Sequence, residues 1–339
     1  MKVYKVGGAV RDKILGIKPI DNDWVVVGSS PEEMVSSGFK PIGKDFPVFL
    51  HPETNEEYAL ARTEKKDGYG YQGFNFYFGK DVSLEKDLSR RDLTINAIAE
   101  DQNGVLIDPF NGLNDIENKI FRHVSSAFSE DPLRAIRVAR FKSYKHLNEF
   151  NLASGTESAL REIVESEEIS KLSMDRLWSE IRRALENEHS SDFFRMLVDF
   201  KMHKYFLPSL KKTECISTKN EKIKWADLQQ KNNFVLGGKL PIPNDFSTVT
   251  NTLRLVSRLD KNDEINELIE LVQEINFIRN EVIIRELCEL PALDISPSFI
   301  GDILTELKKI DFSVLKEIDA DKINEEKNKM FHIALMKIL

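Results

Sequence analysis

Two kinds of hydrophobic pattern divide the chain. Up to about residue 128, short β-branched runs alternate with turn residues and short helical patterns, which is typical of a mixed α/β unit. From Ser129 onward, apolar residues recur at helical spacing and glycines are few. The pattern predicts an α+β fold in which a mixed β-sheet is followed by an all-helical remainder. The predicted strands are residues 2–6, 23–27, 48–51, 57–61, 74–78 and 105–107.

The helical remainder contains one regular segment and one interruption. In residues 173–186 the apolar side chains recur at helical spacing and share one face. Residues 211–233 are polar and irregular, and Pro241–Pro243 breaks the chain. Helical patterns return in residues 248–339, for example at 264–275 and 331–339, where packing is a better explanation than chemistry.

Composition and charge narrow the class of protein. The 339 residues carry 48 Lys and Arg against 56 Asp and Glu, a net charge of −8, and at about 150 residues per domain this length suggests roughly two domains. No stretch approaches the ~20 apolar residues of a membrane helix, and charges interrupt any signal core near the start. Cys215 and Cys288 are far apart and offer no disulfide framework. We therefore expect a cytoplasmic protein without membrane association.

The acidic total does not exclude nucleic acid as a partner, because phosphate contacts need local positive charge. Lys and Arg nearly balance Asp and Glu over residues 1–145, so that most of the excess acid lies further along the chain. The distribution leaves the N-terminal part free to bind nucleotides or RNA.

A pair of glycines follows the first predicted strand. In the run GGAVRD, Gly7 and Gly8 allow the backbone to approach a phosphate closely, and Arg11 adds a forked cation. The run matches neither the P-loop nor the dinucleotide-binding fingerprint. A tight strand-to-helix turn with a solvated arginine is the alternative interpretation.

Two carboxylates lead into the second predicted strand. Asp21 and Asp23 are two residues apart, and the two-residue period of a strand puts them on the same side. Both can then reach one site and bind a hard cation such as Mg²⁺ through oxygen. A polar turn before a strand is the commoner fate of an isolated pair, but the nearby glycines favour phosphoryl chemistry.

The run RRDLTINAIA, residues 90–99, predicts an amphipathic helix with cations at its start. Arg91 and its neighbour Arg90 can bind a triphosphate, while Asp92 and Asn96 are four residues apart and can hydrogen-bond a ribose. A capped surface helix is the alternative interpretation.

The run EDPLRAIRVARF, residues 130–141, predicts a helix with a basic stripe. Asp131 and Arg134 share a face at its start, and Arg137 and Arg140 continue the stripe. An amphipathic helix with a solvated arginine face is the alternative, and only the three preceding motifs favour a functional stripe.

Taken together, these four runs in this order closely resemble the class II bacterial tRNA nucleotidyltransferases, the CCA-adding enzymes. The stretches GKDFPVFLH at 43–51 and ALARTE at 59–64 also look like that family, and LSMDRLWSEIRRAL at 172–185 looks like its helical neck. Beyond Pro208 there is little resemblance. The resemblance is strongest over roughly the first 145 residues.

The resemblance implies an arrangement of head, neck, body and tail. We expect a nucleotidyltransferase head over 1–141, a neck over 142–208 and a helical body and tail over 209–339. The implied activity is the addition of C, C and then A to the 3′ end of tRNA from CTP and ATP, without a nucleic-acid template and with Mg²⁺. The oligomeric state is not implied.

The same resemblance assigns roles to individual residues. Asp21 and Asp23 would be the catalytic metal ligands, Gly8 and Arg11 would contact the triphosphate, and Asp131 with Arg134 would act as an amino-acid template. The remaining nucleotide-binding residues are Arg91, Arg137 and Arg140, with Asp92 and Asn96 at the ribose.

The hydrogen-bonding groups of the bases agree with the template role. Cytosine and adenine each present an amino donor beside a ring-nitrogen acceptor. The Asp131 carboxylate can accept from the amino group while the Arg134 guanidinium donates to the ring nitrogen. Uracil and guanine reverse this pattern, so each wrong base leaves unpaired groups at about 1–3 kcal/mol apiece.

The chain also departs from the resemblance. None of the six histidines is followed by Asp, so an HD phosphohydrolase domain is not expected, although residues 224–231 are a candidate remnant of one. The glycine-rich residues 62–73 predict a mobile loop that favours addition of A, with a hairpin connection as the alternative. Rival interpretations are an A-adding or CC-adding enzyme, a bacterial poly(A) polymerase, and a catalytically silent RNA-binding protein.

Overall fold

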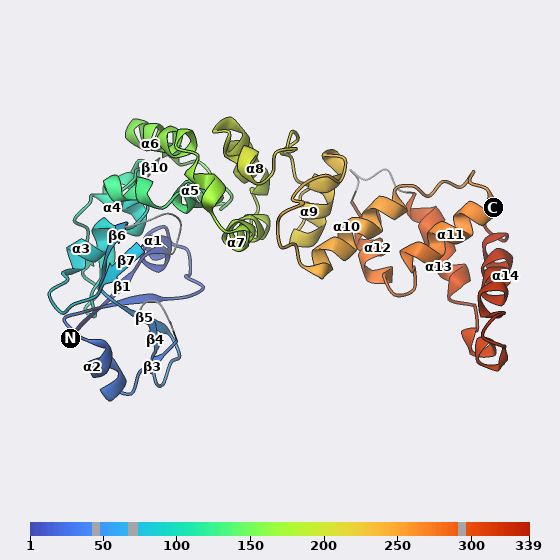
Figure 1. Cartoon of the computed structure of the whole chain (residues 1–339), viewed down its shortest axis with the longest axis horizontal. Helices are drawn as coiled ribbons and strands as arrows, with labels where there is room; N and C mark the ends of the chain where they lie inside the picture. The colour runs from blue at the N-terminus through green and yellow to red at the C-terminus, as the bar shows by residue number, and fades with distance from the viewer. Residues whose placement is uncertain (43–47, 67–73, 291–295) are drawn as a thin grey trace. The chain divides into compact units, whose positions relative to one another are not determined.

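The computed structural model describes residues 1–42, 48–66, 74–290 and 296–339. These residues form two compact units, Met1–Thr213 and Glu214–Leu339. The first contains the β-sheet and the helices that follow it, and the second contains only helices (Figure 1). The predicted α+β class, a mixed sheet followed by helices, is confirmed.

The sheet of the first unit has seven strands in the order β3-β4-β5-β2-β1-β8-β9. The central strand β2 pairs antiparallel with β1 and parallel with β5. Because the β2–β5 pair is parallel, both strands begin at the same edge of the sheet, where Asp23 lies opposite Glu57. The strands are β1 Lys2–Val6, β2 Asp23–Val27, β3 Lys40–Pro41, β4 Val48–Leu50, β5 Glu57–Leu60, β8 Ala99–Glu100 and β9 Leu106–Ile107.

The side chains on the two faces of the sheet belong to two different hydrophobic clusters. Val25, 2% exposed, packs with Val6 and Leu88, whereas its neighbour Val26, 1% exposed, packs on the opposite side with Met34. This alternation is the two-residue period of a strand covered on both faces. Burial of both valines fixes the register of β2 and hence the side to which Asp23 points. The helices of this part are α1 Gly8–Ile14, α2 Pro31–Ser36, α3 Leu84–Ser89 and α4 Gly112–Glu117.

The predicted strands agree with the structure to within one residue at each end. The sequence did not indicate β3, β8, or the parallel pair β10 Ile120–Phe121 and β11 Asn151–Leu152. It also missed β6 Thr63–Lys66, which pairs antiparallel with β7 Phe74–Tyr77. The start of the predicted mobile loop is therefore a strand of a two-stranded ribbon. The rest of that loop, 67–73, and the family-like residues 43–47 lie outside the described residues.

The prediction of a helix over residues 90–99 is wrong. Helix α3 ends at Ser89, a single 3₁₀ turn covers Thr94–Asn96, and the chain then enters β8. The reason is tertiary hydrogen bonding: the Thr94 N–H donates to the Arg122 carbonyl at 2.9 Å and the Thr94 hydroxyl to Asp115 Oδ2 at 2.7 Å. These contacts hold the segment against the following elements in place of a regular helix.

Four helices complete the first unit. Helix α5 packs against both α7 and α8, and α7 begins directly after Ser173, whose hydroxyl accepts from the Arg176 N–H at 3.4 Å. The predicted helix over 173–186 is thus confirmed, with Ser173 as its N-cap and Glu186 as its C-cap. These helices are α5 Leu133–Phe141, α6 Ser154–Glu165, α7 Met174–Leu185 and α8 Ser190–Asp199.

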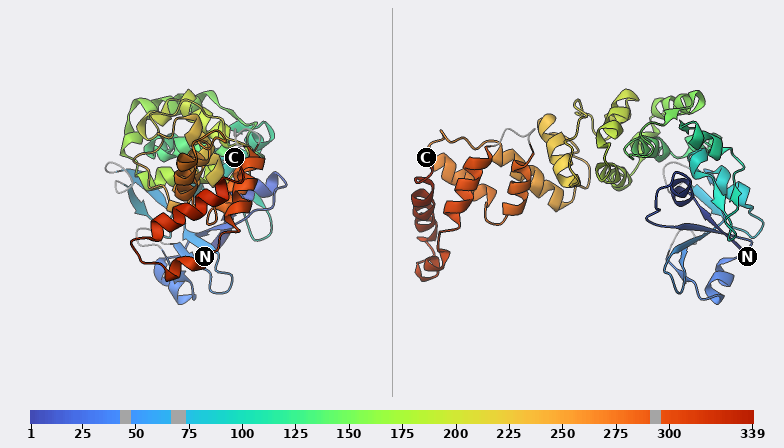
Figure 2. Two further views of the ribbon diagram at one scale, coloured as in Figure 1. Left: turned by 90° about the vertical axis from the view of Figure 1, so that its right-hand side faces the viewer. Right: turned by 180° about the vertical axis from the view of Figure 1, so that it is seen from behind.

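The described residues of the second unit are helices joined by loops (Figure 2). They pack around an apolar cluster of their own, to which α10, α11, α12, α13 and α14 contribute buried residues. Its first helix, α9, corrects the expectation of an irregular segment, because Glu221–Lys231 is helical and largely buried. No helix in the described ranges is long and apolar enough to cross a membrane. The helices are α9 Glu221–Lys231, α10 Asn244–Val256, α11 Ile265–Ile275, α12 Glu281–Cys288, α13 Pro297–Leu307 and α14 Ile323–Leu335.

Candidate active site

A cavity of about 1420 Å³ opens in the first unit between the carboxylate edge of the sheet and helices α5 and α7. Ten Lys and Arg side chains line it against eight Asp and Glu, so that it is locally basic in a chain of net charge −8. All of the site residues expected from the sequence line it: Gly8, Arg11, Asp21, Asp23, Arg91, Asp92, Asn96, Asp131, Arg134, Arg137 and Arg140.

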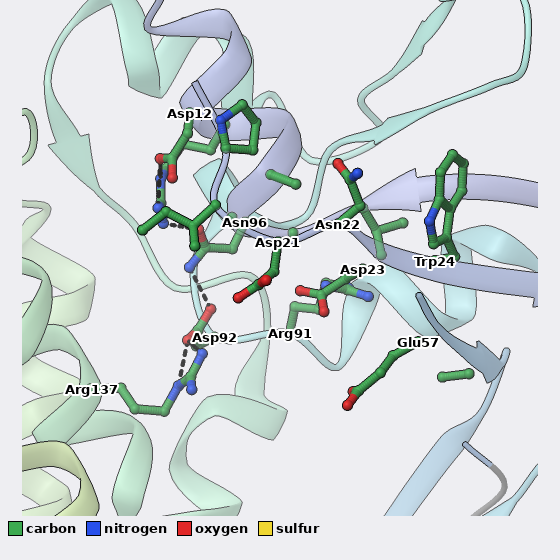
Figure 3. Close-up of a pocket in the computed structure, with 18 of the residues that line it drawn as sticks. Asp12, Asp21, Asn22, Asp23, Trp24, Glu57, Arg91, Asp92, Asn96 and Arg137 are labelled. Carbon is green, nitrogen blue, oxygen red and sulfur yellow. Dashed lines mark hydrogen bonds and ion pairs between the residues drawn. The ribbon is translucent and has the colours of Figure 1, made fainter. Parts of the chain in front are cut away.

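The two aspartates stand at the start of β2 (Figure 3). Both Asp21 and Asp23 are exposed, and within the described part of the chain neither carboxylate makes a hydrogen bond or an ion pair. Sequence reasoning missed Glu57, which its register with Asp23 places beside this pair. Its only local signal is its position as the first residue of a predicted strand.

These carboxylates fit a divalent cation whose coordination is completed by substrate. Mg²⁺ is usually bound by one or two carboxylates together with phosphate and water oxygens. Asp21 and Asp23 supply such a pair with their lone pairs uncommitted. No cluster of three or more His, Cys, Asp or Glu side chains that would enclose a metal is found among the residues that the structure describes.

Glycine is required where the first strand turns into α1. Gly7 has a φ of +76°, a conformation that side chains with a Cβ rarely adopt. A Cβ there would lie 3.0 Å from Arg91 Nη1 and 3.5 Å from Asp23 Oδ2. The missing side chain thus lets the backbone, an arginine and a carboxylate of the cavity approach one another.

A continuous series of hydrogen bonds and ion pairs joins α5 to α1 along the wall of the cavity (Figure 3). Arg137 Nη2 lies 2.8 Å from Asp92 Oδ2, whose other oxygen accepts from Asn96 Nδ2 at 2.9 Å. Arg11 Nη1 donates to Asn96 Oδ1 at 2.7 Å, and its Nη2 lies 2.7 Å from Asp12 Oδ1. Asp92 and Asn96 are 6% and 5% exposed, so they are fixed before any nucleotide arrives.

This series of contacts perturbs the ionisation of its members. Burial by itself raises the pKa of Asp92, but the adjacent Arg137 charge and the hydrogen bond from Asn96 outweigh it and hold that pKa well below its usual value. The same pairing raises the pKa of Arg137 against the effect of burial. The pair therefore stays ionised at neutral pH.

Three arginines gather around one aromatic ring. The guanidinium carbons of Arg11, Arg137 and Arg140 lie 5.5, 5.7 and 4.8 Å from the centroid of Phe141, which is buried at the end of α5. Arg140 Nε also donates to Glu180 Oε2 on α7 at 2.5 Å, and both side chains are 5% exposed. The Phe141 ring and the paired carboxylates together stabilise these guanidinium groups, which carry like charges, at short distances from one another.

The two predicted template residues adjoin the start of α5. Arg134 Nη1 donates to the Ala127 carbonyl at 2.7 Å. Asp131 Oδ1 accepts from the Leu133 N–H at 3.1 Å, and Asp131 Oδ2 lies 2.9 Å from Arg176 Nη2 on α7. Arg176 is not among the candidate site residues that the sequence indicated, so this contact is a finding of the structure.

Asp87, a buried carboxylate on α3, was also missed. It is 0% exposed and accepts from Arg90 Nη2 at 2.8 Å, Arg91 Nη2 at 3.3 Å and the Arg62 backbone N–H at 3.2 Å. Its position three and four residues before the two arginines is the signal that could have found it. Asp87 ties the arginines of the site to the foot of the β6–β7 ribbon.

Two family models match the chain. The poly A polymerase head domain matches residues 3–122, and the probable RNA and SrmB-binding site of polymerase A matches residues 149–213. The chain belongs to the nucleotidyltransferase family of poly(A) polymerases and CCA-adding enzymes. The cavity of this nucleotidyltransferase draws Asp21 and Asp23 from the part that matches the head domain, and Arg176 and Arg183 from the part that matches the RNA-binding site.

Solved structures share the fold of this nucleotidyltransferase over nearly its whole length. The CCA-adding enzyme of Bacillus stearothermophilus in complex with CTP is 22% identical, with a TM-score of 0.69 over 99% of this chain and 89% of that one. Another CCA-adding enzyme with CTP is 22% identical, with a TM-score of 0.64 over 98% and 86%. A tRNA nucleotidyltransferase complexed with a primer tRNA and an incoming ATP analog is 24% identical, with a TM-score of 0.51 over 99% and 95%.

Proposed function

We propose that this nucleotidyltransferase adds C, C and A in turn to the 3′ end of tRNA, using CTP and ATP and releasing pyrophosphate. The observation that carries the proposal is the presence of Asp131 and Arg134 in the same cavity as Asp21 and Asp23. A carboxylate and a guanidinium fit the amino group and ring nitrogen of cytosine and adenine, and they mismatch uracil and guanine. A base-reading pair thus accompanies the groups suited to nucleotidyl transfer.

The comparisons support the substrates of this proposal. Two structures of the same fold hold CTP, and a third holds a primer tRNA with an ATP analog. Residues 149–213 match a probable RNA-binding site. The two cysteines are not paired in a disulfide, which agrees with the cytoplasmic location that we propose.

The arginines of the cavity would bind the nucleotide while they keep the carboxylates with which they are already paired. Arg11 pairs with Asp12, Arg137 with Asp92 and Arg140 with Glu180. A guanidinium has five N–H donors, so each arginine can keep its carboxylate and still donate to a phosphate oxygen. We propose triphosphate contact for Gly8 and Arg11, nucleotide contact for Arg91, Arg137 and Arg140, and ribose contact for Asp92 and Asn96.

Asp21 and Asp23 would hold Mg²⁺. A Mg²⁺ ion held by these carboxylates would supply Lewis-acid chemistry, which would favour deprotonation of the primer 3′-hydroxyl and neutralise charge on the triphosphate and the departing pyrophosphate. The protein's own contribution is to fix the two carboxylates at the edge of a rigid sheet, because β2 is anchored by buried Val25 and Val26. Positioning and charge stabilisation are the main protein contributions to phosphoryl-type transfer.

The test is incorporation by purified protein with Mg²⁺ on three tRNA transcripts that end before CCA, after C and after CC. Each transcript receives labelled CTP, ATP, UTP or GTP, and products are resolved at single-nucleotide resolution. Addition of C, C and A that then stops is the expected result. Incorporation of A on the CC end alone would identify an A-adding enzyme, and addition that stops after CC would identify a CC-adding enzyme.

Two other outcomes would overturn the proposal more broadly. A long run of A on an RNA that does not end in CC would identify a poly(A) polymerase. No incorporation on any transcript, with the RNA still bound, would identify a catalytically silent RNA-binding protein.

A further inference from the structure

We infer that Arg176, on α7, is a positioning residue that determines which bases the site accepts. It acts through Asp131 and therefore rests on the proposed reading of the base by Asp131 and Arg134. Each template residue is contacted by a different part of the chain. Arg134 Nη1 donates to a backbone carbonyl seven residues away in its own segment, whereas Asp131 is contacted by α7, 45 residues further along the chain.

The geometry at Asp131 fixes both carboxylate oxygens. Oδ1 accepts from the Leu133 N–H at 3.1 Å and Oδ2 from Arg176 Nη2 at 2.9 Å. A carboxylate held at one oxygen only can rotate about its last side-chain bond, which is a soft torsion. Contacts at both oxygens fix the plane of the group and hence the directions of its remaining lone pairs. These directions decide whether a base must present an amino group at that point.

The position of Arg176 in its helix strengthens the inference. It is the third residue of α7, in the first turn, where the helix dipole disfavours a cation. Its side chain is 25% exposed and that of Asp131 is 19% exposed, so the ion pair is partly shielded from water at the cavity wall. A cation at this unfavourable helix position is explained by the carboxylate that it contacts.

The base chemistry gives the expected consequence. With Asp131 fixed, the site presents an acceptor to the amino group of cytosine or adenine, and it faces the carbonyl of uracil or guanine with another acceptor. Without Arg176, the carboxylate can turn away from a mismatched carbonyl, so the penalty on the wrong base falls. Binding of the correct base weakens as well, because its partner is no longer held in place.

The experiment compares Arg176→Gln and Arg176→Lys with the wild-type protein in the full chain. Arg176→Gln removes the charge and the fork, and Arg176→Lys keeps the charge alone. The control is Arg182→Gln, an exposed cation on the same helix that pairs with Glu186 and does not line the cavity. The quantities measured are kcat/KM for CTP against UTP and for ATP against GTP, together with the affinity of each nucleotide for the protein by calorimetry.

We expect Arg176→Gln to lower the CTP:UTP and ATP:GTP ratios by about tenfold or more, which is the effect of one charge-assisted hydrogen bond. Arg176→Lys should recover part of the ratio, and Arg182→Gln should leave it unchanged. An equal loss for all four nucleotides, or equal ratios in Arg176→Gln and the control, would overturn the inference. If Arg176→Gln does not fold, as judged by circular dichroism, the CTP:UTP and ATP:GTP ratios of Arg176→Lys are compared with those of the control. Equal ratios in these two variants would then overturn the inference.

The two proposals fail in distinguishable ways. A wild-type protein that incorporates no nucleotide refutes the proposed function, and the calorimetric preference for CTP over UTP then still tests Arg176. A wild-type protein that adds CCA beside an Arg176→Gln variant of unchanged selectivity refutes the role of Arg176 alone.

Discussion

The ion pair between Arg140 and Glu180 is expected to be the main electrostatic link between α5 and α7. Arg140 Nε lies 2.5 Å from Glu180 Oε2, and each side chain is 5% exposed. Glu180→Gln removes the negative charge with little change of shape and leaves the guanidinium buried without its charged partner. Breaking one half of a buried pair costs about 3–5 kcal/mol. The high end applies only where nothing else compensates, and the Phe141 ring beside Arg140 favours the low end, about 3 kcal/mol.

The assay is unfolding of the full chain by urea and by heat, followed by circular dichroism. In a unit of this size a loss of 3 kcal/mol lowers the midpoint temperature by roughly 6–12 °C. The matched control is Glu188→Gln, which removes a glutamate from the exposed pair with Lys145. We expect no measurable shift there, because exposed pairs contribute little.

A double variant separates stability from function. Replacing both partners by apolar residues, Arg140→Met with Glu180→Leu, should recover most of the lost stability, because hydrophobic substitutes for a buried pair are often neutral. It should not recover nucleotide binding, because the guanidinium is gone. The reasoning is refuted if Glu180→Gln unfolds at the same midpoint as Glu188→Gln, or if the double variant is less stable than the single one.

Three further perturbations have defined outcomes. Asp21→Asn and Asp23→Asn should abolish nucleotide incorporation without lowering the unfolding midpoint, since neither side chain is bonded within the described residues; a destabilised variant would contradict this. Gly7→Ala should cost about 1–3 kcal/mol in unfolding free energy, because a φ of +76° with a ψ of −143° is a conformation that is almost confined to glycine. It should also raise the KM for nucleotide by displacing Arg91, and wild-type kinetics would count against it. Because the folded-state pKa of Asp92 is lowered, its contribution to stability is complete above its unfolded pKa of about 3.9 and is lost as pH falls towards the folded value. Acid titration of unfolding should therefore show a smaller loss of stability below about pH 4 in Asp92→Asn than in the wild type.

Local patterns predicted the elements whose structure is decided locally. Strands β1 and β2 were predicted at their observed ends, because the apolar run that includes Val25 and Val26 is bounded by charged or glycine residues. The motifs around Asp21, Asp23 and Arg134 were likewise found as short runs, and the structure places them in one cavity. Their proposed roles remain predictions.

Elements that depend on long-range contacts were missed. Helix α9 is buried on all sides, including Lys224 and Gln229, so its sequence has no polar face to give a helical period. Conversely, residues 90–99 have a helix-like pattern, but hydrogen bonds from Thr94 to Asp115 and to the Arg122 backbone prevent a regular helix. Glu180, the carboxylate that pairs with Arg140, could not be assigned from the sequence, because 40 residues separate the two.

The pairing of each arginine explains how a cation-rich site can exist before its substrate binds. Unpaired guanidiniums around Phe141 would repel one another in a partly dehydrated cavity, and the helices that carry them would separate. Asp12, Asp92 and Glu180 remove this repulsion and also fix the direction of each fork. Under the proposed function, an incoming triphosphate would meet arginines that are already oriented, so that little ordering entropy would be lost on binding. The same pairing also reduces the positive field that these arginines present to any other polyanion.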